Sequence, residues 1–452
     1  MEGFDKYSTF YFVGIGGIGM SAMARYFHNS GAKVLGYDRT STKLTKQLIN
    51  EGIEVQLEDE ITSIIQQLSP ENTLVIYTPA IKSLGIMNYF AENNFKVLKR
   101  AKVLGIITQA TESIAIAGTH GKTTTSALVA HLCKEADLPF SCFLGGIAEN
   151  FNSNFYQQGT KYSVVEADEF DRSFLNLSPS WAIITSNDAD HLDIYGDRAQ
   201  IEESFREFAS LVDEDRQLFV RKGVEVGRGC KTYAVNEEAD FYSDNLRIED
   251  GLMKFDFHQG DQMEVFSWGL PGTHNVENAT AAIALLRSVG VDYEVLKKAL
   301  VKFKGIKRRY TMHEFSSGKI YVDDYAHHPT ELNAVLGSIR TFYPDKKLLV
   351  VFQPHLFSRT RDFEKEFASS LENSDELLLL DIYPAREKGE DFPGVSSQHL
   401  LDRINHSSKE LSSLEESLEK IKQKEFDILL TVGAGNIDTL YEPLKSWLEQ
   451  EA

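Results

Sequence analysis

The sequence predicts an α/β protein of three domains, each built on a mainly parallel β-sheet flanked by helices. Its 452 residues exceed what one hydrophobic core usually supports. Apolar runs of strand length alternate with helical stretches, a pattern typical of parallel sheets with crossover helices. Because this alternation occurs in three successive series, we assign the domains to residues 1–110, 111–310 and 311–452.

The strands of each series follow one another along the chain. The first series predicts strands in "TFYFVG", in the residues that lead to Asp38, and in "NTLVIYTPAI". The second opens with the strand "SIAIAG" and a helix, and continues with the strands "YSVVEAD" and "WAIITSND". The third contains "KIYVDDYAHHP", "KLLVVFQPH", "DELLLLDIYP" and "FDILLTVGAGN", strands that end in polar loops. We therefore expect each series to form its own sheet.

The composition is that of an ordinary globular protein with an acidic charge balance, because 42% of the residues are hydrophobic and 25% charged. The net charge of −20 argues against non-specific binding to nucleic acid or an anionic membrane. No apolar run approaches the roughly 18 to 20 residues of a membrane span, and the N-terminus has no export signal. The scattered Cys133, Cys142 and Cys230 predict core thiols in a reducing compartment. We therefore expect a cytoplasmic protein with no nucleic-acid or membrane partner.

A glycine-rich turn follows the first strand and opens a helix. It consists of Gly14, Ile15, Gly16, Gly17, Ile18 and Gly19, and Asp38 ends the next strand. Glycines leave room for a diphosphate, whose charge the helix amides and dipole stabilise, and Asp38 can accept a hydrogen bond from a sugar hydroxyl or a base. The motif favours an NAD-like or nucleotide-sugar diphosphate; the alternative is a tight turn without a ligand.

A second loop, in "GTHGKTTT", ends like a phosphate-binding P-loop but lacks its opening glycine. The position five before Gly121 is Ile116, and the first glycine is Gly118. The shorter loop still offers backbone amides, the Lys122 ammonium and a Thr123 hydroxyl for magnesium. We therefore predict a phosphate site; the alternative is a helix start whose lysine and threonines serve capping alone.

Two acidic clusters follow later strands of the same domain. The segment "VVEADEFDRSF" contains Glu166, Asp168, Glu169 and Asp171, and "ITSNDADHLDIYGD" contains His191. Carboxylates at strand ends can hold magnesium while a phosphate completes its octahedral shell. Taken singly, the acids can equally form a solvated loop, and His191 can be a polar turn residue. Together, downstream of a phosphate loop, they indicate a metal–nucleotide site.

The order and spacing of a set of motifs resemble the Mur ligase family over nearly the whole chain. The motifs are "GTHGKTTT", "EADEFDRSF", "DADHLDIYGD", "GTHNVENATAA", "KRRY", "DDYAHHPTE" and "QPHLFSRTRDF". The resemblance implies a three-domain enzyme that uses ATP and Mg²⁺ to phosphorylate a carboxylate, so that an amine can attack the acyl phosphate and form an amide. The segments "GIGGIGMSAMA" and "DIYPAREK" resemble the branch that joins L-alanine to UDP-N-acetylmuramate in peptidoglycan precursor synthesis.

The resemblance also implies a role for each matching residue. The catalytic residues would be Lys122, Glu166 and His191, and the Mg²⁺ ligands Thr123, Glu166 and His191. ATP would be bound by Gly118, Thr119, His120, Gly121, Lys122, Thr123, Thr124, Asn275, Asn278, Arg309 and Asp324. The UDP-sugar would be bound by Gly14, Gly16, Gly17, Ile18, Gly19, Asp38 and Arg100, and L-alanine by Tyr325, His328, His355 and Arg359. Helix capping is the alternative for the asparagines, and a structural salt bridge for Arg309 or Asp324.

Two further features bear on the branch of the family. Leu356 stands where some members have an arginine after "QPH", so that Arg361 or Arg386 would have to help hold the alanine carboxylate. The helix expected at 198–212 has no lysine, whereas several sister ligases carry a carbamylated lysine there. This absence resembles the alanine-adding branch.

Two other functions stay open at this point. A ligase that recycles a murein tripeptide would share these motifs but join a whole peptide to the sugar nucleotide; "QPHLFSRTRDF" favours a free amino acid. An NAD-dependent oxidoreductase would follow from the glycine-rich turn alone. It leaves the motifs of the second and third domains without a role.

Overall fold

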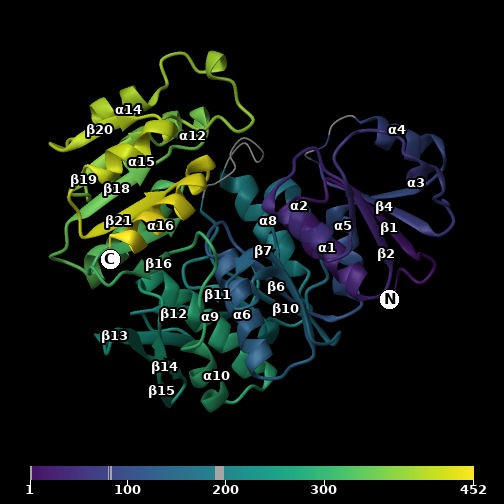
Figure 1. Ribbon diagram of the computed structural model, residues 1–452. Helices are drawn as coiled ribbons and strands as arrows, with labels where there is room; N and C mark the ends of the chain where they lie inside the picture. The colour runs from purple at the N-terminus through teal and green to yellow at the C-terminus, as the bar shows by residue number, and fades with distance from the viewer. Residues whose placement is uncertain (1–2, 80, 82–83, 189–197, 452) are drawn as a thin grey trace. The chain divides into compact units, whose positions relative to one another are not determined.

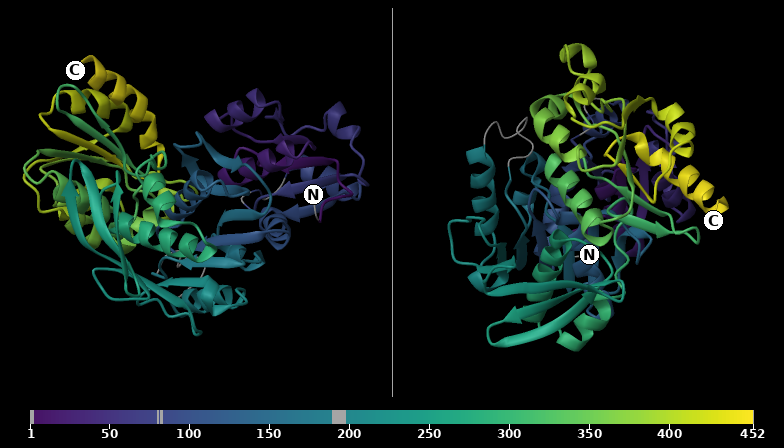
Figure 2. Two further views of the ribbon diagram at one scale, coloured as in Figure 1. Left: turned by 90° about the horizontal axis from the view of Figure 1, so that it is seen from below. Right: turned by 90° about the vertical axis from the view of Figure 1, so that its left-hand side faces the viewer.

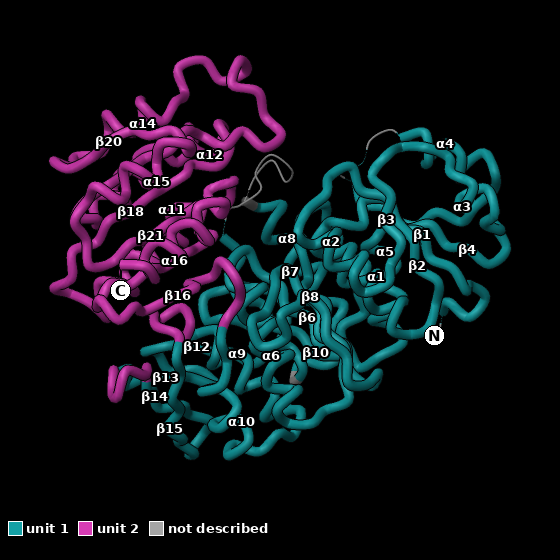
Figure 3. The backbone as a smooth tube through the Cα atoms, in the orientation of Figure 1, with its two compact units in different colours: residues 1–247, 254–269, 276–304 teal, residues 248–253, 270–275, 305–452 magenta. Residues whose placement is uncertain are grey.

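The computed structural model describes residues 3–79, 81, 84–188 and 198–451, and the chain forms three β-sheets (Figure 1). The fold divides into two compact units (Figure 3). Unit 1 consists of Met1–Arg247, Lys254–Gly269 and Val276–Lys304, and unit 2 of Ile248–Met253, Leu270–Asn275 and Gly305–Ala452. The strands named above from the sequence are present, which confirms the prediction of three mainly parallel sheets.

The first sheet has five parallel strands in the order β3-β2-β1-β4-β5. Its strands are β1 (Thr9–Val13), β2 (Lys33–Tyr37), β3 (Glu54–Gln56), β4 (Thr73–Tyr77) and β5 (Lys96–Lys99). Its helices are α1 (Ile18–Asn29), α2 (Lys43–Asn50), α3 (Ser63–Gln66), α4 (Gly85–Glu92) and α5 (Arg100–Gln109). Since neighbouring side chains of a strand point to opposite faces, Phe10 and Phe12 join one core while Tyr11 and Val13 join another.

The second sheet has ten strands in the order β15-β14-β13-β12-β11-β10-β6-β9-β7-β8. They are β6 (Glu112–Ala117), β7 (Phe140–Ala148), β8 (Ser153–Gln157), β9 (Tyr162–Glu166), β10 (Trp181–Ile184), β11 (Leu218–Arg221), β12 (Lys231–Val235), β13 (Phe241–Glu249), β14 (Leu252–Gln259) and β15 (Gln262–Trp268). The helices are α6 (Lys122–Glu135), α8 (Arg198–Ser210), α9 (Thr273–Val289) and α10 (Tyr293–Leu300), with short 3-10 turns η1 (Phe170–Asn176) and η2 (Asp215–Gln217). The central strand β6 pairs in parallel with β9 and β10, so that the loops after these three strands meet at one edge.

The third sheet has six strands in the order β16-β17-β21-β18-β19-β20, and only the β16–β17 pair is antiparallel. The strands are β16 (Thr311–Glu314), β17 (Ile320–Asp324), β18 (Leu348–Phe352), β19 (Glu376–Leu380), β20 (Lys409–Ser412) and β21 (Ile428–Val432). The helices are α11 (Pro329–Phe342), α12 (Phe357–Asp362), α13 (Glu364–Leu371), α14 (Ser397–Arg403), α15 (Leu414–Lys422) and α16 (Tyr441–Gln450), with turns η3 (Gly389–Asp391) and η4 (Asn436–Leu440). Two separate cores cover its two faces, and helices flank both (Figure 2).

Two expectations from composition can be compared with the structure. None of the helices in the described part of the chain has both the length and the apolar character needed to span a bilayer. Cys133 and Cys142 are buried core thiols, as expected, whereas Cys230 is only partly buried.

Candidate active site

The loop between β6 and α6 adopts backbone conformations that favour glycine. Gly118 has φ +136° and Gly121 has φ +80°, both in the region that residues with a Cβ rarely adopt. A Cβ at Gly118 would collide with the Thr185 hydroxyl and lie 2.8 Å from the Ser186 amide nitrogen. The loop therefore reaches a tight conformation with two glycines even though it lacks the opening glycine of a common P-loop.

Residues after the neighbouring strand β10 hold this loop in place. Thr119 Oγ1 lies 2.9 Å from Ser186 Oγ, and the His120 amide donates to the same Ser186 oxygen at 2.9 Å. The Thr185 hydroxyl donates to the His120 carbonyl, and the Asp188 amide donates to Thr119 Oγ1 at 3.1 Å. Since β6 and β10 are adjacent parallel strands, their loops meet at one edge and the phosphate loop is braced there.

Lys122, the first residue of α6, is paired with a buried carboxylate. Its Nζ lies 2.8 Å from Glu169 Oε2 and 3.0 Å from Oε1, and donates to the Gly118 carbonyl at 2.6 Å. Burial by itself lowers the pKa of Lys122, but Glu169, Glu166 and Asp168 outweigh it and raise the pKa, so the ammonium stays charged. Glu169, only 1% exposed, is thus no part of a solvated loop. Sequence reasoning gave it no role of its own.

Thr123, Thr124 and the two asparagines occupy different positions around the loop. Thr123 and Thr124 lie partly exposed in the first turn of α6. Asn278 lies against the loop, because a Cβ at Gly121 would sit 2.8 Å from Asn278 Oδ1. Asn275 is buried within α9, where its side-chain amide donates to the Pro271 carbonyl at 2.6 Å and so does not act as an N-cap.

The glycine-rich turn of the first sheet is fixed by the predicted acid. Gly14 has φ +88°, and the Gly16 amide donates to Asp38 Oδ2 at 2.8 Å. The other Asp38 oxygen accepts from the Thr40 amide at 3.0 Å. Helix α1 begins after Gly17 without a side-chain cap, which leaves the amides of its first turn available to an anion.

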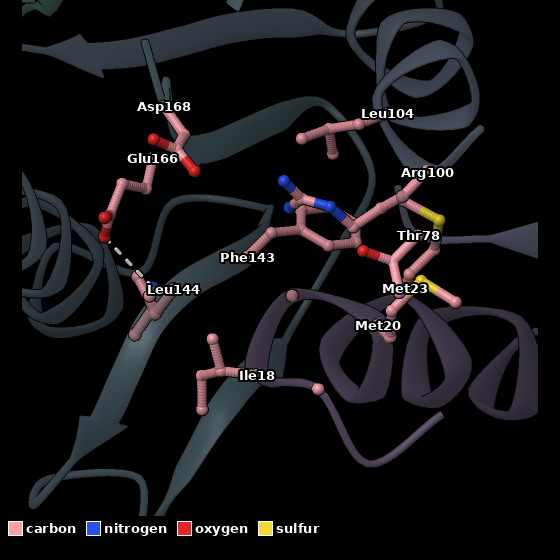
Figure 4. A pocket seen from close by; sticks show the side chains of 13 residues that line it. Ile18, Met20, Met23, Thr78, Arg100, Leu104, Phe143, Leu144, Glu166 and Asp168 are labelled. Atoms are coloured by element: carbon pink, nitrogen blue, oxygen red, sulfur yellow. Dashed lines mark hydrogen bonds between the residues drawn. The ribbon is translucent and has the colours of Figure 1, made fainter. Parts of the chain in front are cut away.

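A cavity of about 340 Å³ within unit 1 brings this turn together with the acids of the second sheet (Figure 4). Its lining includes Gly17, Ile18, Gly19, Thr78, Arg100, Phe143, Glu166 and Asp168. The Arg100 guanidinium occupies the space that a side chain at position 19 would fill. Because residue 19 is glycine, Arg100 can lie over the start of α1. On the other wall, the Gly145 amide donates to Glu166 Oε2 at 3.1 Å. One cavity therefore carries a cation beside a helix N-terminus at one end and two carboxylates at the other.

Arg309 and Asp324 lie in unit 2 beside Tyr325. Asp324 is buried and accepts from the Tyr310 and Ala326 amides, each at 2.7 Å. Burial raises the pKa of Asp324 to about 6, against the opposing effect of Arg309. The Arg309 guanidinium lies 5.1 Å from the Tyr325 ring centroid and 3.6 Å from Glu331 Oε1. The two predicted residues thus belong to one polar cluster.

Three of the residues predicted to bind the amino acid form a cluster, and the fourth has a different environment. Rings of Tyr325 and His355 each lie within 6 Å of the His327 ring, and Arg359 Nη1 lies 3.4 Å from His355 Nδ1. His328 instead accepts from the Thr330 amide as the N-cap of α11, and its ring packs on Phe363. Burial lowers the pKa of His355 to about 4, with His327 and Arg359 acting in the same direction. The histidine that lies with this cluster is the neighbouring His327, which the sequence did not single out, and the role of His328 stays a prediction.

Other predicted residues receive weaker support from geometry. Leu356 occupies the position where some family members have an arginine. It is buried with φ +72°, and its amide donates to the Tyr383 carbonyl at 3.0 Å. Arg361 pairs with Asp362 at 2.7 Å, and Arg386 is exposed. His191 lies outside the described residues. Within the described ranges, no three His, Cys, Asp or Glu side chains form a ready metal site.

Comparisons with known proteins agree along the whole chain. Family models match residues 9–112 as "Mur ligase family, catalytic domain", 116–286 as "Mur ligase middle domain" and 308–435 as "Mur ligase, glutamate ligase domain". A UDP-N-acetylmuramate:L-alanine ligase from Christiangramia forsetii is 48% identical over 456 residues, covering 100% of both chains. The crystal structure of UDP-N-acetylmuramate-alanine ligase from Thermotoga maritima matches with a TM-score of 0.82 at 27% identity, covering 98% of this chain and 100% of that one.

A murein peptide ligase from Psychrobacter arcticus has the same fold, with a TM-score of 0.69 at 22% identity and 98% of both chains covered. Three mainly parallel sheets, a braced loop between β6 and α6, and a cavity lined by a second glycine-rich turn agree with an ATP-dependent, amide-bond-forming ligase, and the relatives confirm that class. The chain belongs to the Mur ligase family.

Proposed function

We propose that the protein joins L-alanine to the carboxylate of UDP-N-acetylmuramate, with ATP converted to ADP and phosphate, as a step of peptidoglycan precursor synthesis in the cytoplasm. The observation that carries the proposal is the shared cavity, in which Arg100 and the start of α1 lie at one end and Glu166 and Asp168 at the other. The diphosphate of a sugar nucleotide matches the cationic end of this cavity. At the acidic end, Mg²⁺ held by Glu166 would offset the repulsion between these side chains and the substrate carboxylate. The names of similar proteins, UDP-N-acetylmuramate:L-alanine ligases, support this choice of the two substrates.

The phosphate loop would hold ATP next to this cavity. The amides at the uncapped N-terminus of α6 would bind the phosphate chain, and the Lys122 ammonium would neutralise part of its charge. Asn278 lies beside the loop, and Arg309 and Asp324 stay predicted ATP-binding residues. With ATP so placed, a carboxylate oxygen attacks the γ-phosphorus and ADP leaves.

Magnesium fits the donors around the loop. Mg²⁺ is usually held by one or two carboxylates, with phosphate oxygens and water completing the shell, so a ready cluster of three protein ligands is not required. The Glu166 carboxylate lines the cavity, the Thr123 hydroxyl lies at the start of α6, and His191 is the third predicted ligand. When bound, the metal neutralises the charge that builds up on the transferred phosphoryl group.

The second half-reaction forms the amide. The amine of L-alanine attacks the acyl carbon, loses a proton, and the tetrahedral intermediate expels phosphate, which is a far better leaving group than the original carboxylate oxygen. We assign the alanine site to the cluster of Tyr325, His327, His355 and Arg359. Arg359 would pair with the amino-acid carboxylate, because a guanidinium can donate two parallel hydrogen bonds to the two carboxylate oxygens. The neutral imidazole of His355 adds no charge near the amine at pH 7.

Phosphate release from ATP tests the proposal directly. The assay contains Mg²⁺ and UDP-N-acetylmuramate, with L-alanine, glycine, L-serine or the L-alanyl-γ-D-glutamyl-diaminopimelate tripeptide as acceptor in parallel reactions. We expect release that depends on both the sugar nucleotide and L-alanine. Release with the tripeptide alone would assign the recycling reaction instead, and no release with any acceptor would refute the proposed ligation.

A further inference from the structure

The hairpin formed by β7 and β8 packs on α1, the helix that follows the glycine-rich turn. The Tyr26 ring of α1 lies 5.4 Å from the ring of Phe143 in β7 and 6.3 Å from that of Phe155 in β8. Phe143 and Phe155 belong to a core that joins the first and second sheets within unit 1, and Tyr26 packs against that core. A polar side chain in this apolar contact has to be satisfied by partners, since an unpaired buried amide is costly.

Asn154 of β8 is such a side chain, and it binds the start of α1. It is fully buried, and its amide nitrogen donates to the Ile18 carbonyl at 2.5 Å and to Ser21 Oγ at 2.9 Å. Its amide oxygen accepts from Arg25 Nη1 at 2.5 Å. Both ends of the amide are therefore used, and every partner belongs to α1.

Arg25 is itself held in place. It is 6% exposed and makes two hydrogen bonds to the Glu51 carboxylate, at 2.7 and 2.9 Å. Nε and Nη2 of the guanidinium bind Glu51, and Nη1 binds Asn154, so these two residues together fix its orientation. Rotation of Asn154 would leave a buried charge-assisted hydrogen bond unmade, which makes the arrangement rigid.

The same hairpin also reaches the acidic end of the cavity. Phe143, Leu144 and Gly145 of β7 line the cavity, and the Gly145 amide donates to Glu166. Ile18, whose carbonyl Asn154 binds, lines the opposite wall. The hairpin thus contacts both the helix start that would face the diphosphate and the carboxylate that would face the reacting end of the substrate.

We propose that Asn154, oriented by Arg25, is a positioning residue that sets the glycine-rich turn and the start of α1 relative to Glu166, and thereby governs affinity for the sugar nucleotide. The inference rests on the proposed function only for the identity of that ligand. Asn154 touches no substrate; it acts through the backbone of Ile18. Its loss should therefore affect the sugar nucleotide and leave ATP and L-alanine unaffected.

The test compares Asn154→Ala with Asn150→Ala. Asn150 lies in the turn of the same hairpin and also makes two side-chain hydrogen bonds, to the Lys302 carbonyl and from the Lys304 amide, each at 2.8 Å, but none of these reaches α1. We expect Asn154→Ala to raise the KM for UDP-N-acetylmuramate on the order of tenfold, with KM for ATP and L-alanine within about twofold of wild type. Asn150→Ala should leave all three constants unchanged.

Asn154→Asp is the second variant, in case the alanine variant does not fold. It keeps an acceptor for Arg25 but cannot donate to the Ile18 carbonyl, so we expect a raised KM for the sugar nucleotide with a smaller loss of stability. Equal rises in all three KM values, or an unchanged KM with a lowered melting temperature, would reduce Asn154 to a purely structural residue and overturn the inference.

Calorimetric titration with UDP alone separates this inference from the proposed function. If wild type binds UDP and Asn154→Ala binds it about tenfold more weakly, the positioning role holds even if no acceptor supports phosphate release. If both proteins bind UDP equally, the role of Asn154 is refuted even when the ligase assay succeeds.

Discussion

Lys122 keeps a carboxylate partner in a place from which water is largely excluded. The ammonium is 13% exposed and Glu169 is nearly fully buried, so each charge depends on the other for its stability. When ATP binds, its phosphates supply further negative charge next to the same lysine. Glu169 therefore has two effects: it holds Lys122 ready for a phosphate and it competes with that phosphate.

Replacing Glu169 with Gln should destabilise the protein without nucleotide and make nucleotide a stronger stabiliser. We expect the free energy of unfolding to fall by about 3 kcal/mol, because Lys122 loses its charged partner. Mg²⁺-ADP should raise the melting temperature of this variant more than that of wild type, because phosphate replaces the missing carboxylate. Glu203→Gln, which breaks an exposed pair with Arg206, is the control. Equal shifts in wild type and Glu169→Gln would contradict the assigned role.

His355 contributes a pH dependence whose sign follows from its lowered pKa. In the unfolded chain an imidazole titrates near 6.5, whereas burial lowers the pKa of His355 to about 4. Between these values the unfolded state binds more protons, so the free energy of unfolding falls as the pH falls from 6.5 towards 4. Asp324 acts oppositely, because its pKa is raised to about 6 and its folded form binds the extra proton.

Comparing wild type with His355→Gln isolates the contribution of His355 to the pH dependence of the unfolding free energy. From pH 7 to pH 5, we expect His355→Gln to lose about 1 kcal/mol less unfolding free energy than wild type in urea titrations. A His355→Gln curve parallel to that of wild type would show that the imidazole does not titrate in this window.

The turn between β6 and α6 is shorter than the common P-loop, because its first glycine is Gly118. Gly118 supplies an unusual backbone conformation and also the space that Thr185 and Ser186 occupy. The side chains after β10 then hold the loop from outside. A shortened loop is stable here because its neighbour in the sheet braces it.

Two glycine variants separate backbone strain from lack of space. Gly223, after β11, has φ +92° and nothing within 4 Å of an added Cβ, so Gly223→Ala should cost about 1 kcal/mol for strain alone. Gly118→Ala adds a collision with the Ser186 amide, and we expect a larger loss of stability together with loss of ADP binding. Urea denaturation and ADP titration measure the two effects. A Gly118→Ala variant that binds ADP like wild type would refute the steric argument.

The division into two compact units predicts how ligands stabilise the chain. The glycine-rich turn and the phosphate loop belong to unit 1, and the proposed alanine cluster belongs to unit 2. We expect two calorimetric transitions, of which UDP-N-acetylmuramate raises only one, by about 2.7 kcal/mol of stabilisation at one hundred times its Kd. A single transition, or an equal rise of both, would mean that the units unfold together.

Local patterns predicted much of the fold and many candidate residues. Apolar runs of strand length marked the strands, because burial on both faces of a parallel sheet requires them. Glycine spacing identified both loops, since few other residues adopt the backbone that each needs. Glu166 and Asp168 were singled out because Glu166 ends the buried strand β9 and Asp168 follows it, where the loops of a parallel sheet gather.

Pairings between distant segments could not be predicted in this way. Nothing in "EADEFDRSF" distinguishes Glu169, which pairs with Lys122, from Asp171, which is exposed. The adjacent histidines of "DDYAHHPTE" are equally plausible in sequence, yet His328 caps α11 and His327 faces His355. Asn154 gave no signal, because its partners lie more than a hundred residues away.

The sequence by itself determined the family, the three sheets and the two glycine loops of this protein, because these depend on residue type and short spacing along the chain. Only the tertiary structure decided which carboxylate neutralises Lys122, which histidine of "DDYAHHPTE" lies against His355, and which asparagine holds the start of α1. The physical reason is that burial and charge pairing depend on neighbours in space, and packing of the sheets chooses those neighbours.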